Sequence, residues 1–538
     1  MTTEFGIFDY IVVGAGSAGC VVASRLSESG KYTVLLLEAG PADQNFWIKA
    51  PLGYAKVFSD PKINWMYDSE PESELDGRPM YQPRGKVLGG TSSINGMIHI
   101  RGNAQDYDNW SDSGCHGWSW KEVLPYFKKS EDWELGSDDV RASGGPLKVT
   151  TNTTKNPIGE AVISAAGDIG IAFKPDFNDG IQAGVGYYQH NVYRGQRWSI
   201  YQAYLSKAKK RSNLKINTNS VVSRILIGDG KATGVEFVHN DSLFHATCNK
   251  EIIISGGVFG SPQLLMLSGI GNPSELRELG IDVAATAPQV GKNLHDHFYV
   301  QLMYECTQPI TINDVANSWL RLGLEGAKYL LFRKGALAST HLYVGGFVKS
   351  SEDLIQPDIQ FNMAAWSVAE RTASGAKPHP FSGFSLNPIH LRPQARGTVK
   401  LRSADSQDKP VINFNFFESE NDRKAMLFGV RLIRKLAAQP QLQKYIKSEI
   451  QPGEKIASDQ EIIEFVRNKG VSNLHAAGTC RMGSNPDDSV VDPRLRLHCL
   501  KNIRVVDASI MPQIISGNPN AAIVMIAEKA ADMILCDA

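Results

Sequence analysis

The segment FDYIVVGAGSAGCVVASRLSESGKYTVLLLEAG, residues 8–40, most strongly constrains how this chain can fold. It reads as an apolar strand, a tight turn, a helix with apolar residues at helical spacing and a second buried strand. The turn holds the pattern G-x-G-x-x-G at Gly14, Gly16 and Gly19, and the second strand ends at Glu38. Together these features predict a parallel strand–helix–strand unit that binds a dinucleotide.

Each position of the turn has a physical role in that prediction. Gly14 allows the sharp turn, Gly16 lets the backbone approach a pyrophosphate, and Gly19 lets the helix pack on the strand. Ser17 and Ala18 lie at the start of the helix, where unpaired N–H groups and the positive end of the helix dipole favour an anion. A glycine turn that serves packing alone is the alternative interpretation.

The end of the second strand is where we expect the ribose of the dinucleotide to bind. Glu38, followed by Ala39, lies where a carboxylate accepts the ribose hydroxyls of a dinucleotide. An acid at this position disfavours a 2′-phosphate. The motif alone does not distinguish FAD from NAD.

Composition excludes several other classes of protein. Lys plus Arg equals Asp plus Glu, 56 each, so no net charge draws the chain to nucleic acid. The seven cysteines form no CxxC pair, which disfavours a disulfide framework or a zinc knuckle and fits a reducing compartment. The apolar start has no basic stretch before it, and no apolar run reaches the roughly 18 residues of a membrane span. We therefore expect a cytoplasmic protein with no membrane span.

Longer motifs then identify a family. The stretch PRGKVLGGTSSINGMIHIRGNAQDYDNW (83–110) resembles the first signature of the glucose–methanol–choline (GMC) oxidoreductases, which are FAD-dependent. SPQLLMLSGIG (261–271) is similar to their second signature. LHAAGTCRMG (474–483) and RVVDASIMPQIISGNPNAAIVMIAEKAAD (504–532) resemble their C-terminal block. The resemblance covers nearly the whole chain and implies FAD as the cofactor.

The resemblance also implies which residues hold the cofactor. A glycine-rich loop such as LGGTSSING has little side-chain bulk and can lie against a flat ring system. Val222 matches the position whose backbone holds the adenine, although such a valine alone is more often part of a core. The remaining positions are Val87, Gly90, Asn95, Gly96 and Met97 along the flavin and diphosphate, Asp507 and Ala508 at the pyrophosphate and ribityl chain, and Asn518 nearby.

One departure from the family pattern concerns the attachment of the flavin. Members with histidyl-bound FAD carry a histidine immediately before the asparagine of SSxN. Here that position is Ile94. We therefore expect non-covalent FAD.

The resemblance places the catalytic pair near the C-terminus, at His475 and Asn520. Oxidation of an alcohol removes an O–H proton, and a histidine is the natural acceptor because its pKa lies near neutrality. Asn520 would donate from its amide to the substrate oxygen as negative charge gathers there. Asn518, two residues earlier in the NPN turn, could take the same role, and the family register of the following helix favours Asn520.

Other histidines and aromatic residues receive weaker interpretations. His295 and His297 are expected to be structural, because no third metal ligand clusters near them in sequence. His341, Tyr343 and Trp366 are candidate walls of the substrate pocket, with core packing as the alternative. We expect no metal site.

The fold expected from the resemblance is α/β, with an α+β substrate domain. A Rossmann-like FAD-binding domain takes residues 1–305, with some substrate-domain elements within 150–195. A substrate-binding domain with an antiparallel sheet takes 306–452. The segment 453–538 returns to the FAD domain and carries the catalytic His and Asn. The stretches 398–403 and 411–417 read as strands, and 422–439 as an amphipathic helix.

The expected function is FAD-dependent oxidation of a small organic alcohol to an aldehyde or ketone. The resemblance is strongest to the bacterial choline-, sorbose- and alcohol-dehydrogenase-like branch, which favours a dehydrogenase with a quinone-type or other electron carrier. An oxidase that uses O2 is the first alternative. A hydroxynitrile lyase of the same fold is a second, since it would also use a histidine base. A light-driven decarboxylase is disfavoured because that branch does not keep the histidine, and a purely structural flavoprotein would leave His475 and Asn520 unexplained. The motifs do not identify the alcohol.

Overall fold

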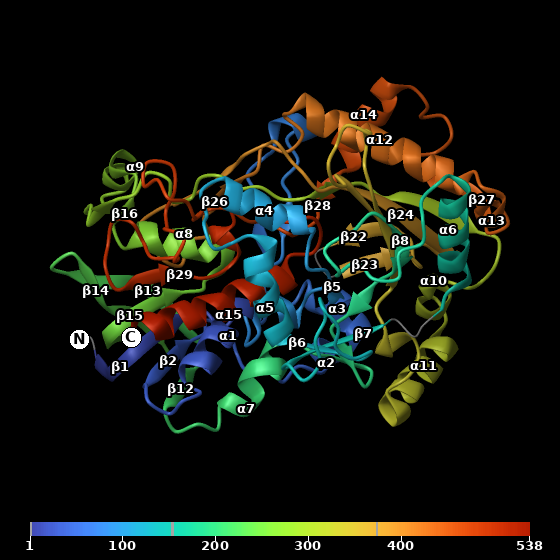
Figure 1. Ribbon diagram of the computed structural model, residues 1–538. Helices are drawn as coiled ribbons and strands as arrows, with labels where there is room; N and C mark the ends of the chain where they lie inside the picture. Colours follow the sequence, from blue (N-terminus) through green and yellow to red (C-terminus); the bar gives the residue numbers. More distant parts are fainter. Residues whose placement is uncertain (1–2, 152–154, 373–374) are drawn as a thin grey trace.

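Two large β-sheets organise the molecule. The computed structural model describes residues 3–151, 155–372 and 375–538. Over these residues, one sheet and its helices lie at the end that carries both termini, and the other sheet lies at the opposite end (Figure 1).

The first sheet has seven strands in the order β12-β2-β1-β15-β14-β13, with β29 paired to β15. Five of these strands run parallel, and β13 and β14 form an antiparallel hairpin on the edge. The apolar run at residues 10–13 predicts the first strand, which begins seven residues earlier in the structure. The run at residues 33–37 predicts the second strand, which is confirmed within one residue. The strands are β1 (Thr3–Val13), β2 (Val34–Leu37), β12 (Leu214–Asn217), β13 (Ser220–Gly228), β14 (Lys231–His239), β15 (Ser242–Ile254) and β29 (Ile503–Val505).

Two helices from opposite ends of the chain pack together beside this sheet. The predicted helix after the glycine turn is confirmed as α1 (Ser17–Leu26), which connects β1 to β2. It contacts α15 (Asn520–Asp537), the last helix of the chain (Figure 1). Arg25 of α1 reaches the buried Glu528 of α15 at 2.7 Å. The N-terminal unit and the C-terminal block therefore form one body.

The second sheet has eight strands and is antiparallel throughout its pairings. Its order is β27-β19-β24-β21-β20-β8, and β18 joins β24 to β28. The strands are β8 (Gly184–Tyr187), β18 (Phe298–Tyr299), β19 (Leu302–Cys306), β20 (Leu342–Val348), β21 (Ile359–Ala364), β24 (Gly383–His390), β27 (Ile446–Gln451) and β28 (Val471–Ser472). β8 falls inside the range 150–195 expected to contribute to this region. β18, most of β19 and β28 fall outside the expected range 306–452, because strands distant in sequence complete the sheet.

The amphipathic helix expected over 422–439 is confirmed as α12 (Glu420–Ala437). Its buried residues include Met426, Val430 and Ile433, at the spacing of one helical face. The helix contacts β24 closely, since a Cβ at Gly429 would come within 2.8 Å of Pro388. The predicted strands near 400 and 412 are confirmed as β25 (Thr398–Lys400) and β26 (Val411–Asn413).

Candidate active site

The glycine turn between β1 and α1 is shaped for close backbone approach. Gly14 has φ +94°, and a Cβ there would lie 2.4 Å from the carbonyl oxygen of Ser255. A Cβ at Gly19 would lie 1.9 Å from the carbonyl oxygen of Gly14, so only glycine lets the helix pack here. At Gly16, by contrast, a Cβ would meet no atom within 4 Å. The turn therefore packs tightly against the protein at Gly14 and Gly19, and it leaves open space beside Gly16.

The start of α1 is free to receive an anion. Gly16 is its N-cap, no side chain caps it, and its first turn, which includes Ser17 and Ala18, contains no acidic residue. Unpaired N–H groups at a helix start attract a phosphate. This cradle fits the diphosphate of a dinucleotide.

Glu38 lies at the end of β2, beside the turn. Its carboxylate accepts hydrogen bonds from the backbone N–H groups of Ala15 at 2.8 Å and Gly40 at 2.9 Å. Burial raises the pKa of Glu38 to about 7, although these two hydrogen bonds oppose the rise. The adjoining Ala39 is half-buried. A carboxyl group fixed in this way can accept ribose hydroxyls.

The loop of the first GMC-like signature lies directly on the glycine turn. The N–H of Gly89 donates to the carbonyl oxygen of Ala15 at 2.8 Å. A Cβ at Gly90, which has φ +52°, would lie 2.6 Å from Cα of Gly16. Two glycine-rich segments separated by more than seventy residues in sequence thus form one surface.

The end of this loop is anchored by a buried arginine. Arg197 donates to Oδ1 of Asn95 at 2.8 Å and to the carbonyl oxygen of Ser92 at 3.1 Å. Met97 follows with φ +64°, and its N–H also donates to Oδ1 of Asn95. Gly96 between them is half-buried. Sequence reasoning did not identify Arg197 as the residue that holds the loop.

Two apolar residues of the same loop lie in a core of their own. Val87 and Ile94 are fully buried in a small cluster with Ile48, Val57 and Ile63. The position that carries the histidyl linkage in some GMC members is therefore occupied here by a packed aliphatic side chain.

The remaining predicted cofactor residues lie along the first sheet. Val222 is half-buried in β13, two residues after Ser220, whose N–H donates to the carbonyl oxygen of Glu38. Asp507 follows β29 and accepts from the N–H of Gly257 at 2.9 Å. Ala508 accepts from the N–H of Gly478 at 3.2 Å, which ties this strand end to the segment of His475.

His475 lies within a cluster of polar side chains. Its Nδ1 is 3.0 Å from Nδ1 of His297 and 3.2 Å from Nδ2 of Asn473. Its Nε2 is 2.9 Å from Nδ2 of Asn518. The backbone N–H of His475 donates to the buried carboxylate of Asp296 at 2.7 Å, which fixes the main chain. The histidine thus contacts residues from three separate segments.

The structure reverses the contacts expected for the two asparagines of the NPN turn. Asn518, expected on the cofactor side, contacts His475. Asn520, expected as the partner of His475, accepts a hydrogen bond from the hydroxyl of Ser17 at 2.7 Å. The physical reason is that α15 begins at Asn520, whose side chain meets the start of α1, whereas Asn518 still lies in the preceding turn.

His295 and His297, both expected to be structural, contact different parts of the protein. His295 accepts from the N–H of Ile514 at 2.8 Å and contacts the carbonyl oxygen of Asn293 at 2.6 Å, so it holds main chain. His297 is fully buried and meets His475 ring edge to ring face, at 5.2 Å between centroids. Sequence gives no signal that His297 meets a histidine 178 residues away.

Both imidazoles of this pair are held neutral. Burial, assisted by the positive charge of Arg84, lowers the pKa of His475 to about 3, although part of this residue's surface stays exposed. Burial also lowers the pKa of His297 well below its ordinary value, with His475 as a further cause. A neutral imidazole offers one lone pair and one N–H. The pair can therefore both accept and relay a proton.

Two buried polar atoms beside the pair are unsatisfied among the described residues. Oδ1 of Asn518 and Nε2 of His297 have no hydrogen-bond partner there. Buried polar atoms are normally paired, so such atoms indicate where a bound molecule completes the site. With the open face at Gly16 and the converging glycine loops, the residues present fit a dinucleotide and a small polar substrate.

The other expected pocket residues form an aromatic group. His341 stacks on Tyr54 at 5.1 Å and contacts Trp366 edge-on at 5.9 Å. Tyr343 is buried in the core of the second sheet.

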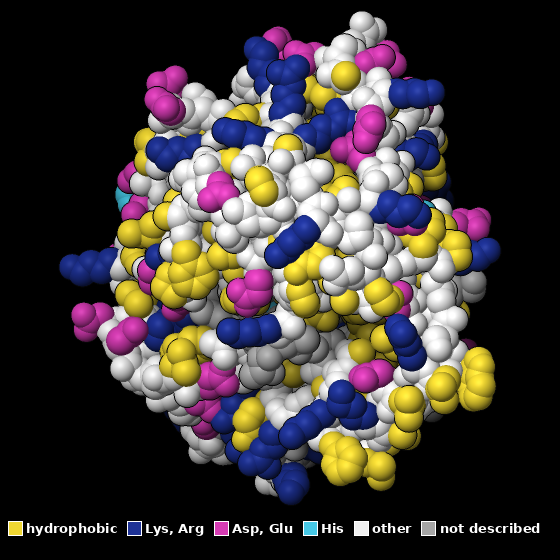
Figure 2. All heavy atoms as spheres, turned by 90° about the vertical axis from the view of Figure 1, so that its right-hand side faces the viewer, with side chains coloured by type: hydrophobic (Ala, Val, Ile, Leu, Met, Phe, Trp, Pro, Cys, Tyr) yellow, Lys and Arg dark blue, Asp and Glu magenta, His cyan; other side chains and the backbone are white. Residues whose placement is uncertain are grey.

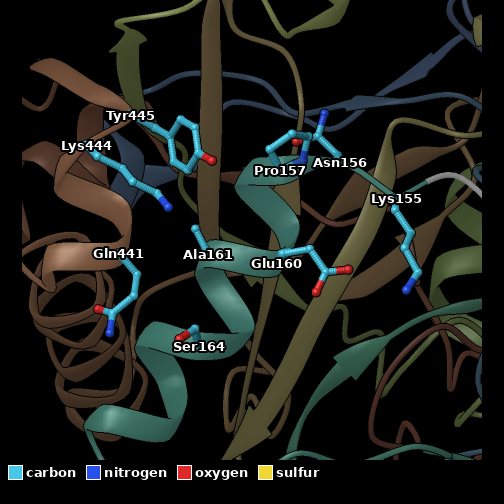
Figure 3. Close-up of a pocket in the computed structure, with 9 residues that line it drawn as sticks. All are labelled: Lys155, Asn156, Pro157, Glu160, Ala161, Ser164, Gln441, Lys444 and Tyr445. Carbon is cyan, nitrogen blue, oxygen red and sulfur yellow. The ribbon is translucent and has the colours of Figure 1, made fainter.

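A hollow of about 720 Å³ lies elsewhere, between α6 (Pro157–Asp168) and α13 (Pro440–Gln443) (Figure 3). It contains none of the predicted site residues. Its lining is Lys155, Asn156, Pro157, Glu160, Ala161, Ser164, Gln441, Lys444 and Tyr445.

A nucleotide cradle joined to a buried histidine pair defines the class of this protein as a nucleotide-dependent oxidoreductase of mixed α/β fold. Family models described as GMC oxidoreductase match residues 8–299 and 393–527. The chain belongs to the GMC oxidoreductase family.

Individual relatives align with nearly the whole chain. Mitochondrial choline dehydrogenase of Homo sapiens is 42% identical over 535 residues, which cover 98% of this chain and 89% of the relative. Alcohol dehydrogenase [acceptor] of Pseudomonas putida is 41% identical over 533 residues, covering 98% and 96%. The crystal structure of pyridoxine 4-oxidase from Mesorbium loti superposes with a TM-score of 0.89 at 29% identity, covering 97% of this chain and 98% of that one.

Proposed function

We propose that the protein oxidises a small organic alcohol to an aldehyde or ketone with FAD as its cofactor, and that His475 accepts the hydroxyl proton. The observation that carries this proposal is the contact of His475 with Asn518 at 2.9 Å, beside an unsatisfied amide oxygen. The chemistry that FAD supplies when bound is acceptance of a hydride from the alcohol carbon.

We assign the ring proton of His475 to Nδ1. The contacts allow two tautomers, since the amide of Asn518 suits a lone pair on Nε2 and the amide of Asn473 suits one on Nδ1. A base needs its lone pair on the side of the unsatisfied Asn518 oxygen, which selects Nε2 as the accepting atom. Nδ1–H then donates to His297, which orients the ring and spreads the charge after protonation.

We further propose that the roles of the two asparagines are exchanged relative to the sequence prediction. Asn518, beside His475, orients the alcohol and donates to its oxygen as negative charge develops. Asn520, bonded to Ser17 at the glycine turn, belongs to the cofactor side. The proposed FAD-contacting set otherwise keeps the residues predicted from the sequence, and the FAD is non-covalent because Ile94 offers no nucleophile.

The proposed reaction is that of a dehydrogenase located in the cytoplasm, with a quinone-type or other carrier as electron acceptor. The names of the relatives support alcohols, choline among them, as the substrate class. The range 306–452, with the strands that complete its sheet, is proposed as the substrate domain.

The test is an anaerobic titration of the purified yellow protein with a panel of alcohols, followed by air. We expect one class of alcohol to bleach the oxidised flavin band, and colour to return slowly in air and rapidly with a quinone. Fast return in air would identify an oxidase instead. A loaded flavin that no alcohol bleaches would contradict the proposal, and cyanohydrin cleavage would then test the lyase alternative.

A further inference from the structure

The helix α11 (Trp319–Phe332) exposes a row of large apolar side chains. Only Tyr329 of its 14 residues is buried. The exposed fractions of Trp319, Leu331 and Phe332 are 86%, 73% and 67%. We call α11 patch the set Trp319, Leu320, Leu324, Leu330 and Leu331, each at least 56% exposed. Soluble proteins rarely leave so much contiguous apolar surface uncovered without a binding role.

The helix is amphipathic with its apolar side turned outward. Trp319, Leu320, Leu324, Leu330 and Leu331 share one face at the 3.6-residue period, and Tyr329 lies on the opposite face. Tyr329 anchors the helix, because its hydroxyl lies 3.5 Å from the carbonyl oxygen of Lys49 and its ring 6.0 Å from that of Phe46. Tyr329 is thus the one buried residue on the inner face of the helix, whereas the apolar face meets solvent.

Neighbouring residues extend this surface and give it a charge. α2 (Phe46–Lys49), beside Tyr329, adds Phe46 and Trp47, which are 39% and 38% exposed. Between 319 and 334 the chain carries four basic residues and one acid, in a protein whose net charge is zero. The acid, Glu325, accepts a hydrogen bond from the N–H of Ala336 at 2.6 Å and lies 3.5 Å from Nζ of Lys328, so three of the four cations have no acidic partner within the helix. The exposed basic residues are Arg321, Lys328, Arg333 and Lys334.

A basic hollow adjoins the end of the helix. Its volume is about 470 Å³, and its lining includes Lys49, Arg197 and Arg333. Figure 2 views the end of the molecule that carries α11 and shows apolar side chains at its lower edge with Lys and Arg side chains beside them. Cations at the border of an apolar surface suit the phosphates of a lipid headgroup layer.

We propose that the α11 patch docks on the surface of an anionic phospholipid bilayer. The helix lies in the plane of the interface, its apolar face enters the headgroup and acyl boundary, and its basic border contacts anionic headgroups. None of the helices in the described residues is long and apolar enough to cross a membrane, so the attachment is peripheral. A second copy of the chain suits the patch less well, because a twofold interface would bring its four cations against four equal charges.

The test uses the FAD-loaded protein and sedimentation with vesicles of phosphatidylcholine alone or with an equal part of phosphatidylglycerol. We expect the protein to sediment with the anionic vesicles, weakly with the neutral ones, and less as salt rises, because salt screens the basic border. Leu320→Glu/Leu331→Glu should lower the vesicle-bound fraction about tenfold or more, since it places acids on the apolar face.

The matched control is Ile7→Glu/Leu535→Glu. It makes the same chemical change at two exposed positions near the chain termini, at the other end of the molecule (Figure 1). We expect this variant to bind vesicles like the wild type, and both variants to keep the flavin spectrum and vesicle-free activity. Lys328→Gln/Lys334→Gln should lose much of the preference for anionic vesicles while keeping its fold.

Three results would overturn the proposal. Wild-type protein could remain in the supernatant with both vesicle types, or Leu320→Glu/Leu331→Glu could sediment as the wild type does. Analytical ultracentrifugation could instead reveal a dimer that this variant converts to monomer, which would make a second copy the occupant of the patch.

Discussion

At the scale of single residues, the site depends on keeping His475 neutral so that it can accept a proton. Burial is the main cause of its low pKa, and the charge of Arg84 is the second. Arg84 is itself half-buried, and burial lowers its pKa to about 10, so it stays charged at neutral pH. The charge of Arg84 therefore disfavours protonation of His475 in the free enzyme.

This arrangement predicts an unusual dependence of rate on pH. Neutral His475 is the active form, so kcat/KM should be flat from neutral pH to about pH 4 and fall as pH approaches about 3. Arg84→Met removes the neighbouring cation, raises the pKa of His475 and should move the acid limb to higher pH. Arg84→Lys keeps the charge and should retain the wild-type profile. Identical acid limbs in Arg84→Met and wild type would show that the cation does not control the base.

The exchanged asparagines give a second prediction at this scale. Asn518→Ala should lower kcat about 10²-fold, because it removes a donor to the developing oxyanion, and should leave FAD content unchanged. Asn520→Ala should mainly lower FAD content, because Asn520 bonds to Ser17 at the cradle, with turnover per bound flavin near wild type. Flavin absorbance and turnover on each purified variant make the comparison. The opposite pattern would restore Asn520 as the catalytic residue.

At the scale of elements, a buried charge cluster joins a small sheet to its loops. The strand order of this sheet is β5 (Ile98–His99), β9 (Gln189–His190), β7 (Leu147–Thr151) and β6 (Glu131–Trp133). Glu131 of β6 (Glu131–Trp133) lies 2.6 Å from Arg101 and 2.7 Å from Arg141. Arg101 follows β5 (Ile98–His99), the strand that comes directly after the glycine-rich loop ending at Met97. All three side chains are fully buried. The carboxylate therefore holds two buried guanidinium groups together, and Asp176 adds a second partner for Arg141 at 2.6 Å.

Removal of that carboxylate charge should destabilise the protein. Glu131→Gln leaves the buried Arg101 without its carboxylate partner and leaves Arg141 with Asp176 alone, which costs about 3–5 kcal/mol of unfolding free energy. Urea denaturation measures the loss, and Glu420→Gln on the exposed face of α12 is the matched control, with a midpoint near wild type.

The same cluster predicts a dependence of stability on pH. Burial raises the pKa of Glu131, but Arg101, His99 and Arg141 outweigh it and lower the pKa below its ordinary value. The stabilisation is thus fully present above the unfolded pKa of about 4.3 and is lost as pH falls below it. The difference between Glu131→Gln and wild type should shrink in acid. A constant difference down to low pH would contradict this origin.

At the scale of the whole molecule, local patterns predicted local elements well. The strand–helix–strand unit and α12 follow from apolar periodicity and glycine geometry, which act over a few residues. The contact between His297 and His475 was not predictable, because it depends on how β18 and β28 pair across the second sheet. The apolar pattern of α11 reads the same whether its face is covered or exposed, so only the structure identifies the α11 patch.

The most direct test of the central claim is the rate at which an alcohol bleaches the flavin in anaerobic stopped-flow, compared between wild type and His475→Ala. Loss of the base should slow flavin reduction about 10²- to 10⁴-fold while FAD content and the fold are kept. Equal rates in the two proteins would show that His475 is not the group that takes the proton.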